Sequence, residues 1–262
     1  MSADSFQNIK RLLASSRPGE LSEGLELVRQ QMDKSDSAEN RSLFEVITPL
    51  FYIDTLDHPE LVPILNEAVD LTVRFGSWVI PILVDSLDEG DIKAQWAVSH
   101  VLGRMGADAI QPLVRQYTST DNPTLRAFIL YALGKVKSPQ VVKATSPALE
   151  AAQAENLELR DTATRALGKF IESIPPKDLS KELKRKIIDG LRRNLSDPNA
   201  SVRSKAIRSL GKMARYDHLT EAECSQLKAV CHRILGTDEN GEWDRAYIVR
   251  KEAEEALAHL MD

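Results

Sequence analysis

The sequence predicts an all-α protein built from stacked pairs of antiparallel helices, and three observations support this. A Leu-Gly tag occurs four times along the 262 residues and once more in a decayed form. An apolar stripe at helical spacing precedes each tag. Residues that favour helices, such as alanine, leucine, glutamate and lysine, are abundant, whereas only 5% of residues are aromatic.

The glycine of the tag defines the repeat. The tag stands in AVSHVLGRM, FILYALGKV, TATRALGKF and KAIRSLGKM, and EEALAHL is the decayed copy. The glycine position is occupied by Gly103, Gly134, Gly168, Gly211 and Ala258. Intervals of 31, 34, 43 and 47 residues suit units of two antiparallel helices. Residues 77–262 are therefore predicted to form five repeats.

The second helix of each repeat carries the apolar stripe. In the fourth repeat the stripe consists of Val202, Ala206, Ser209, Leu210 and Met213. These residues share one helix face, and the small ones predict close approach of a neighbouring helix. We expect the tag glycine either to serve the same approach or to relax the helix near its end; both roles are structural. Asp197-Pro198 and Asn122-Pro123 are helix start signals.

The remaining apolar segments predict the other helices. The first helices of the repeats are expected at Ile80–Leu87, Ile110–Tyr117, Val141–Ala152, Leu183–Leu195 and Leu227–Leu235. Residues 1–76 match the repeat poorly, and their helices are expected at Ser5–Ala14, Leu21–Met32, Glu39–Tyr52 and Pro59–Phe75. A cap of degenerate repeats is the favoured role for residues 1–76, because an array must shield its end from water. A separate interaction domain is the alternative.

The pattern D-P-x-x-x-V-R-x-x-A-x-x-x-L-G-x-M in Asp197–Met213 resembles the HEAT repeats. Over about residues 77–262 the chain is most similar to the HEAT-like repeats of phycobilisome lyases and related bacterial proteins. The resemblance implies an α-α superhelix, a HEAT-like solenoid. It also implies that an arginine before the stripe bonds an acidic residue of a neighbouring repeat. Arg126, Arg160, Arg203 and Arg250 occupy this position, and Gln95 replaces arginine in the first repeat.

The resemblance places the second helices on a concave surface, so their outward positions are candidates for a partner-binding groove. The candidate residues are Trp96, His100, Arg104, Tyr131, Lys135, Arg165, Lys169, Arg208 and Lys212. The position two residues after the tag leucine is basic in four consecutive repeats. This column predicts a groove that binds an anionic group. The alternative is that these residues are helix formers that solvate the exposed face.

Charge is segregated along the chain, although the net charge is only −5. Residues 1–100 carry 8 Lys/Arg and 17 Asp/Glu, whereas residues 160–215 carry 15 and 6. This favours an acidic protein partner, or self-association through opposite charges. A sequence pI of about 5.7 and the acidic flanks disfavour nucleic acid, especially a long duplex.

Motifs for catalysis and for cofactors are missing from the sequence. It contains no HExxH, GxxxxGK[ST], GxGxxG or GxSxG, and Cys224 and Cys231 lack metal or redox spacing. We therefore expect no catalytic residue, no cofactor and no metal, and an enzyme is disfavoured. The lack of an apolar run of ~18 residues predicts no membrane contact. The start has no apolar core of a secretory signal, so a cytoplasmic protein is expected.

These patterns together predict a non-catalytic scaffold or adaptor that binds a protein partner in its groove, with an acidic segment as one candidate. Two alternatives stay open at the level of sequence. The repeat subtype implies a bilin lyase or a lyase-chaperone subunit. A basic groove with aromatic residues is also similar to that of HEAT-like DNA alkylation-repair glycosylases, which bind nucleic acid.

Overall fold

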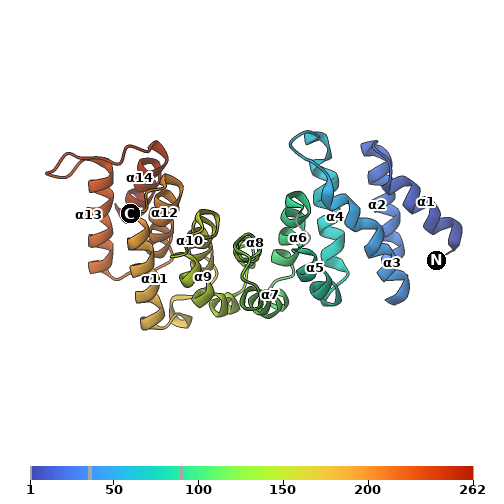
Figure 1. Ribbon diagram of the computed structural model, residues 1–262, viewed down its shortest axis with the longest axis horizontal. Helices are drawn as coiled ribbons and strands as arrows, with labels where there is room; N and C mark the ends of the chain where they lie inside the picture. The colour runs from blue at the N-terminus through green and yellow to red at the C-terminus, as the bar shows by residue number, and fades with distance from the viewer. Residues whose placement is uncertain (1, 35–36, 89–90, 262) are drawn as a thin grey trace. The chain divides into compact units, whose positions relative to one another are not determined.

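The computed structural model describes residues 2–34, 37–88 and 91–261. Within these ranges the chain forms fourteen α-helices, five short 3-10 helices and no strand, so the all-α prediction is confirmed. The chain divides into two compact units, Met1–Pro112 and Leu113–Asp262 (blue to green and green to red in Figure 1). This division concerns compactness and not the repeat pattern, and the predicted boundary at residue 76 stays a prediction.

Unit 1 contains the helices expected for residues 1–76 and the first repeat. Its elements are α1 (Ala3–Leu13), α2 (Pro18–Met32), α3 (Ser37–Ile47), η1 (Thr48–Tyr52), η2 (Pro59–Leu61), α4 (Val62–Arg74), η3 (Ser77–Val79), α5 (Ile80–Ser86) and α6 (Ile92–Arg104). The predicted helix over residues 39–52 is divided between α3 and η1. Pro49 explains the division, because proline lacks the N–H that would continue an α-helix.

The core of unit 1 joins elements that are distant in sequence. The rings of Phe44, Phe75 and Trp78 meet edge to face, with centroids 5.6–6.0 Å apart. Helix α4 packs against both α2 and α6. Edge-to-face contacts add to the free energy gained by burying aromatic surface. They fix α4 against the start of the first repeat.

Unit 2 contains the remaining repeats. Helix α7 (Ala107–Ser119) spans the division between the units, which falls at its internal Pro112. The elements after it are α8 (Pro123–Leu133), η4 (Pro139–Ala144), α9 (Thr145–Ala151), α10 (Leu157–Ile171), η5 (Pro176–Asp178), α11 (Lys181–Asn194), α12 (Ala200–Arg215), α13 (Glu221–Leu235) and α14 (Tyr247–Met261). The second helices α8, α10, α12 and α14 pack in series (Figure 1).

Two tag glycines lie where successive second helices touch. A Cβ on Gly168 of α10 would lie 2.8 Å from the Cβ of Ser209 on α12. A Cβ on Gly211 of α12 would lie 2.9 Å from the Cβ of Ala256 on α14. Both distances are shorter than a real Cβ contact, so only glycine fits. The predicted role of the tag glycine is confirmed at these two positions.

The expected arginine ladder links the same helices. Arg160 Nε donates to Asp197 Oδ2 at 2.6 Å. Arg203 binds Asp244 with two hydrogen bonds, of 2.7 Å from Nε and 2.9 Å from Nη2. Each arginine also donates from Nη1 to two carbonyl groups of the loop before its own helix. Planar bidentate pairing of this kind is strong and directional, and it fixes one repeat on the next.

The joint between α8 and α10 is built differently. A Cβ on Gly134 would meet the next repeat no closer than 3.7 Å, at the Cβ of Lys169. Arg126 pairs with the fully exposed Asp121 of its own loop, not with the next repeat. The position that holds Asp197 and Asp244 in later repeats is Ala154 here. The joint between α8 and α10 therefore has neither the close glycine contact nor the arginine–aspartate pair of the later joints.

Candidate functional site

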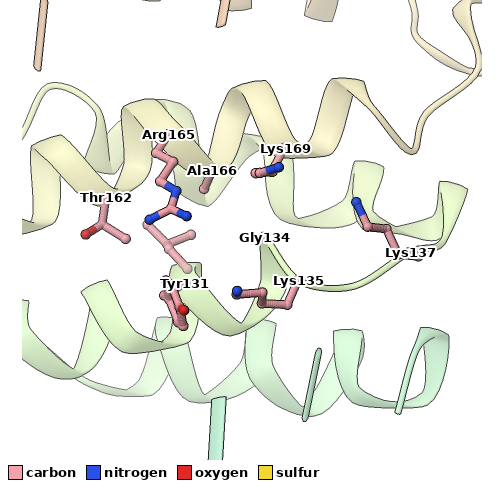
Figure 2. A pocket seen from close by; sticks show the side chains of 9 residues that line it. Tyr131, Gly134, Lys135, Lys137, Thr162, Arg165, Ala166 and Lys169 are labelled. Carbon is pink, nitrogen blue, oxygen red and sulfur yellow. The ribbon is translucent and has the colours of Figure 1, made fainter. Parts of the chain in front are cut away.

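A pocket of about 240 Å³ lies at the open joint between α8 and α10 (Figure 2). Four of the predicted groove residues line it: Tyr131, Lys135, Arg165 and Lys169. The other lining residues are Leu130, Gly134, Lys137, Thr162 and Ala166. The lining thus contains four cationic side chains and no carboxylate.

Local helix structure explains why these side chains converge. Asn122 begins α8 by accepting the N–H of Thr124 at 3.0 Å, and Asn156 begins α10 by accepting that of Leu159 at 2.9 Å. Tyr131 and Lys135 are four residues apart, as are Arg165 and Lys169. In α10 this spacing places Arg165 and Lys169 on one helix face, whereas α8 ends at Leu133 and Lys135 lies in the turn that follows it. Tyr131, the turn after α8 and this face of α10 therefore line the same pocket.

The ring of Tyr131 organises the positive charge. Lys135 Nζ lies 5.0 Å from the ring centroid and the guanidinium carbon of Arg165 lies 5.7 Å from it. Figure 2 shows Arg165 extending from α10 toward the tyrosine on α8. Burial raises the pKa of the Tyr131 phenol, and the charge of Arg165 opposes that rise. Within the described part of the chain, Arg165 forms no ion pair with a carboxylate.

Lys169 is held differently, through Glu172. Glu172 binds Lys169 at 3.0 Å, Lys137 at 3.2 Å and Lys212 at 2.7 Å. Burial raises the pKa of Glu172, but the hydrogen bonds from Lys212 and Lys169 outweigh burial and hold it at about 2. One carboxylate shared among three ammonium groups leaves this side of the pocket with an excess of positive charge.

Arg208 and Lys212 do not line this pocket. Arg208 Nε donates to Oε2 of the buried Glu252 at 2.7 Å, which joins α12 to α14. Lys212 is largely buried against Glu172, and burial lowers its pKa. These two predicted groove residues brace neighbouring repeats. The basic column seen in the sequence is thus divided between a pocket and internal ion pairs.

Trp96, His100 and Arg104 lie on α6 in unit 1. Trp96 and His100 line a different pocket, of about 510 Å³, with a mostly apolar lining. Arg104 forms an ion pair with Asp70 of α4. Six of the nine candidates thus line a pocket, two in unit 1 and four in unit 2, and the other three, Arg104, Arg208 and Lys212, form ion pairs.

Sequence reasoning missed Lys137 and Thr162 at the first pocket, and Leu56, Val62 and Ile92 at the second. Lys137 and Leu56 lie in loops, which have no helical register to place them. Ile92 could have been found from the sequence. It directly follows the helix-capping Asp91 and lies outside the apolar stripe, so its large apolar side chain is not part of the buried helix face.

The described residues contain no group of three or more histidine, cysteine, aspartate or glutamate side chains that could hold a metal ion. Burial raises the pKa of the Cys231 thiol to about 11, and that of Cys224 is raised by burial as well. Protonated thiols are poor nucleophiles. No described helix is both long and apolar enough to span a bilayer.

Sequence comparison gives the family. Residues 80–167 match the HEAT repeats family, and residues 124–254, half of the chain, match the family described as non-SMC mitotic condensation complex subunit 1. The chain belongs to the HEAT-like repeat superfamily. The second match places its repeats in that condensation-subunit family. The two matched ranges overlap, so they describe one run of repeats. No curated protein matches the chain.

Solved structures agree on the fold. The complex of CpcE and CpcF of phycocyanin lyase from Nostoc sp. PCC7120 matches with a TM-score of 0.54 and 21% identity, over 68% of this chain and 97% of that one. A designed armadillo repeat protein in complex with the peptide (KR)4 matches with a TM-score of 0.52 and 15% identity, over 94% and 100%. The archaeal HEAT-like repeats protein from Thermococcus onnurineus NA1 matches with a TM-score of 0.51 and 14% identity, over 98% and 97%. At these identities the likeness establishes a repeat-solenoid fold and nothing about ligands.

Proposed function

We propose that this HEAT-like repeat protein is an adaptor that binds an acidic segment of a protein partner at the α8–α10 pocket. One observation carries the proposal: four cationic side chains converge on a pocket that no carboxylate lines. The planar guanidinium of Arg165 suits a carboxylate or phosphate, because it can donate two parallel hydrogen bonds. Lys135, in the turn after α8, supplies a second charge.

The size of the pocket supports a side chain as the occupant. About 240 Å³ lies below the range of roughly 300–1,000 Å³ that is usual for cofactors and drug-sized ligands. A glutamate, aspartate or phosphorylated side chain fits this space better than a tetrapyrrole. A bilin lyase is therefore not favoured by this pocket, and the net charge of −5 argues against a nucleic-acid groove.

The test measures binding of a rhodamine-labelled oligoglutamate peptide by fluorescence anisotropy. We expect Lys135→Glu combined with Arg165→Glu to raise the dissociation constant at least about tenfold, because two attractive charges become repulsive. The control combines Lys143→Glu with Lys177→Glu, which changes the net charge equally at exposed sites outside the pocket. Its affinity is expected to stay within about twofold of the wild type.

Two results contradict the proposal. Equal loss of affinity in the pocket variant and the control means that only the overall charge matters. Tight binding of an oligothymidylate, lost in the pocket variant, assigns the pocket to a nucleic-acid backbone.

A further inference from the structure

Unit 1 holds an apolar pocket that the acidic-segment site does not use. It measures about 510 Å³ and is lined by residues 53–56, by α4 and by α6 between Ile92 and His100. Four large hydrophobic side chains around it stay exposed: Leu56 (92%), Ile92 (59%), Trp96 (45%) and Val62 (41%). Single exposed hydrophobic residues are ordinary, but a cluster around one cavity marks an interaction site.

The local structure holds these side chains outward. The Asp54 side chain accepts the N–H groups of Leu56 at 3.0 Å and Asp57 at 3.3 Å, which forms a turn with Leu56 at its tip. Lys93 Nζ binds Asp54 at 2.7 Å and so ties the turn to α6. The loop before α4 stands out from the helices of unit 1 (Figure 1). An ion pair and two hydrogen bonds therefore support one wall of the pocket.

The start of α6 supplies the facing wall. Asp91 caps this helix by accepting the N–H groups of Lys93 at 2.9 Å and Ala94 at 3.1 Å. The cap places Ile92 in the first turn and Trp96 one turn later on the same face. Both side chains line the same cavity as Leu56. The turn at Asp54 and the helix cap at Asp91 thus hold these apolar side chains at the surface.

Charge around the pocket is negative. Asp57 and Glu60 are exposed in the loop beside Asp54. Lys93 is the one lysine or arginine among the lining residues, and it is paired with Asp54. Residues 1–100 as a whole carry 17 Asp/Glu against 8 Lys/Arg. A ligand that complements this surface is positively charged next to an apolar portion.

We propose that this pocket docks a protein segment in which one or two large apolar side chains are flanked by lysine or arginine. The apolar side chains enter between Leu56, Ile92 and Trp96, and the basic residues face Asp57 and Glu60. A segment of polypeptide suits the site better than a small molecule, because Leu56 and Ile92 are largely exposed and a ligand confined to the cavity would leave much of their apolar surface in water. Buried apolar anchors with a charged rim are the usual arrangement of energetically important interface residues.

The test selects a random peptide library on the full chain and measures the enriched peptides, labelled with rhodamine, by fluorescence anisotropy. We expect enriched peptides to combine tryptophan, phenylalanine, leucine or isoleucine with neighbouring lysine or arginine. Leu56→Ser combined with Ile92→Ser should raise the dissociation constant about tenfold or more, because the apolar anchors lose their contacts. Both residues are exposed, so the double variant is expected to keep the wild-type melting temperature.

Two control variants separate this site from other surfaces. Ile248→Ser removes an exposed hydrophobic residue of α14 and should leave peptide affinity unchanged. Lys135→Glu with Arg165→Glu should also leave it unchanged, so that failure of the acidic-segment site is distinguished from failure here.

Three outcomes overturn the inference. One is enrichment of acidic or wholly polar peptides. Another is equal binding of basic, apolar peptides to the wild type and to the Leu56→Ser, Ile92→Ser variant. The third is that no peptide is enriched while an apolar dye binds and is lost in the double variant, which assigns the pocket to a small apolar ligand.

Discussion

Two joints of the same repeat pattern differ in how closely the helices approach: the joint between α8 and α10, and the joint between α10 and α12. At the second joint, Gly168 lies directly against Ser209 and Arg160 binds Asp197. At the first joint, Gly134 has ordinary spacing to the next repeat, and Ala154 stands where an aspartate would receive Arg126. The comparison shows that the tag defines where a joint lies, whereas the partner residues decide how tightly it closes.

How closely two repeats pack also decides whether their cationic residues form internal ion pairs or border a pocket. At the tight joints Arg208 and Lys212 lie against the carboxylates of Glu252 and Glu172, and they hold repeats together. At the open joint Lys135 and Arg165 border a pocket. The proposed site for an external anion thus lies where the repeats leave room and where no carboxylate is among the lining residues. Three predictions, each with its own variants, test this comparison, in order of decreasing expected effect.

Gly168→Ala is expected to destabilise the chain by about 2 kcal/mol, because its Cβ would overlap Ser209 and the helices would have to separate. Gly134→Ala, the matched change at the open joint, should alter the free energy of unfolding by less than about 0.5 kcal/mol or stabilise slightly. Thermal unfolding followed by circular dichroism measures both. Equal effects at the two glycines would mean that the joints do not differ in closeness.

Ala154→Asp is expected to stabilise unit 2 by roughly 1 kcal/mol, because it restores the acidic partner that the ladder lacks at the open joint. The Nε atom of Arg126 is buried without a hydrogen-bond acceptor among the described residues. The new carboxylate could therefore accept a hydrogen bond from this atom. Chemical denaturation of the single variants Ala154→Asp and Arg126→Ala, and of the double variant, gives the coupling energy. A coupling energy near zero would show that Arg126 cannot reach the new carboxylate.

His218 should make the tight region sensitive to pH, with the smallest effect of the three. Its ring is buried beside the end of α10; burial lowers its pKa, and hydrogen bonds with the backbone of Ile171 and Ile174 oppose that shift. A depressed pKa means that the unfolded chain binds the proton more readily. The stabilising effect is therefore present above about pH 6.5 and is lost as the pH falls toward the folded pKa.

The measurement compares melting temperatures between about pH 8 and pH 5 for the wild type, His218→Gln and the exposed control His232→Gln. The wild type and the control should lose more stability on acidification than His218→Gln. An unchanged pH profile in His218→Gln would assign the pH dependence to carboxylates alone.

Much of the fold could be predicted, because helix-forming segments are decided locally. The apolar stripes and the tag located nearly every helix, since these signals act within one or two turns. Asn122 caps α8 as predicted, but α12 is capped by Asn199 and not by Asp197. The interruptions at Pro49 and within residues 139–152 were missed, although the prolines that cause them stand in the sequence. The arginine ladder was predicted from resemblance and is confirmed for Arg160 and Arg203, while Arg126 departs from it.

The candidate site was predicted only in part, because it depends on which side chains face one another across repeats. Tyr131, Lys135, Arg165 and Lys169 were selected by their position on the second helices, and the structure gathers them at one pocket. The same rule also selected Arg208 and Lys212, since helical spacing does not reveal a carboxylate supplied from another helix. Glu172 and Glu252 are such carboxylates.

The sequence by itself determined the repeat, its helices and the residues on the exposed face of each second helix, because these follow from periodicity along the chain. Only the tertiary structure decided which joints close, which cations are neutralised and where an apolar pocket is left exposed. The physical reason is that these properties arise from contacts between residues some 30 to 45 positions apart, such as Lys205 with Asp161 and Arg203 with Asp244. Periodicity places each partner on a face, but packing alone brings the two together.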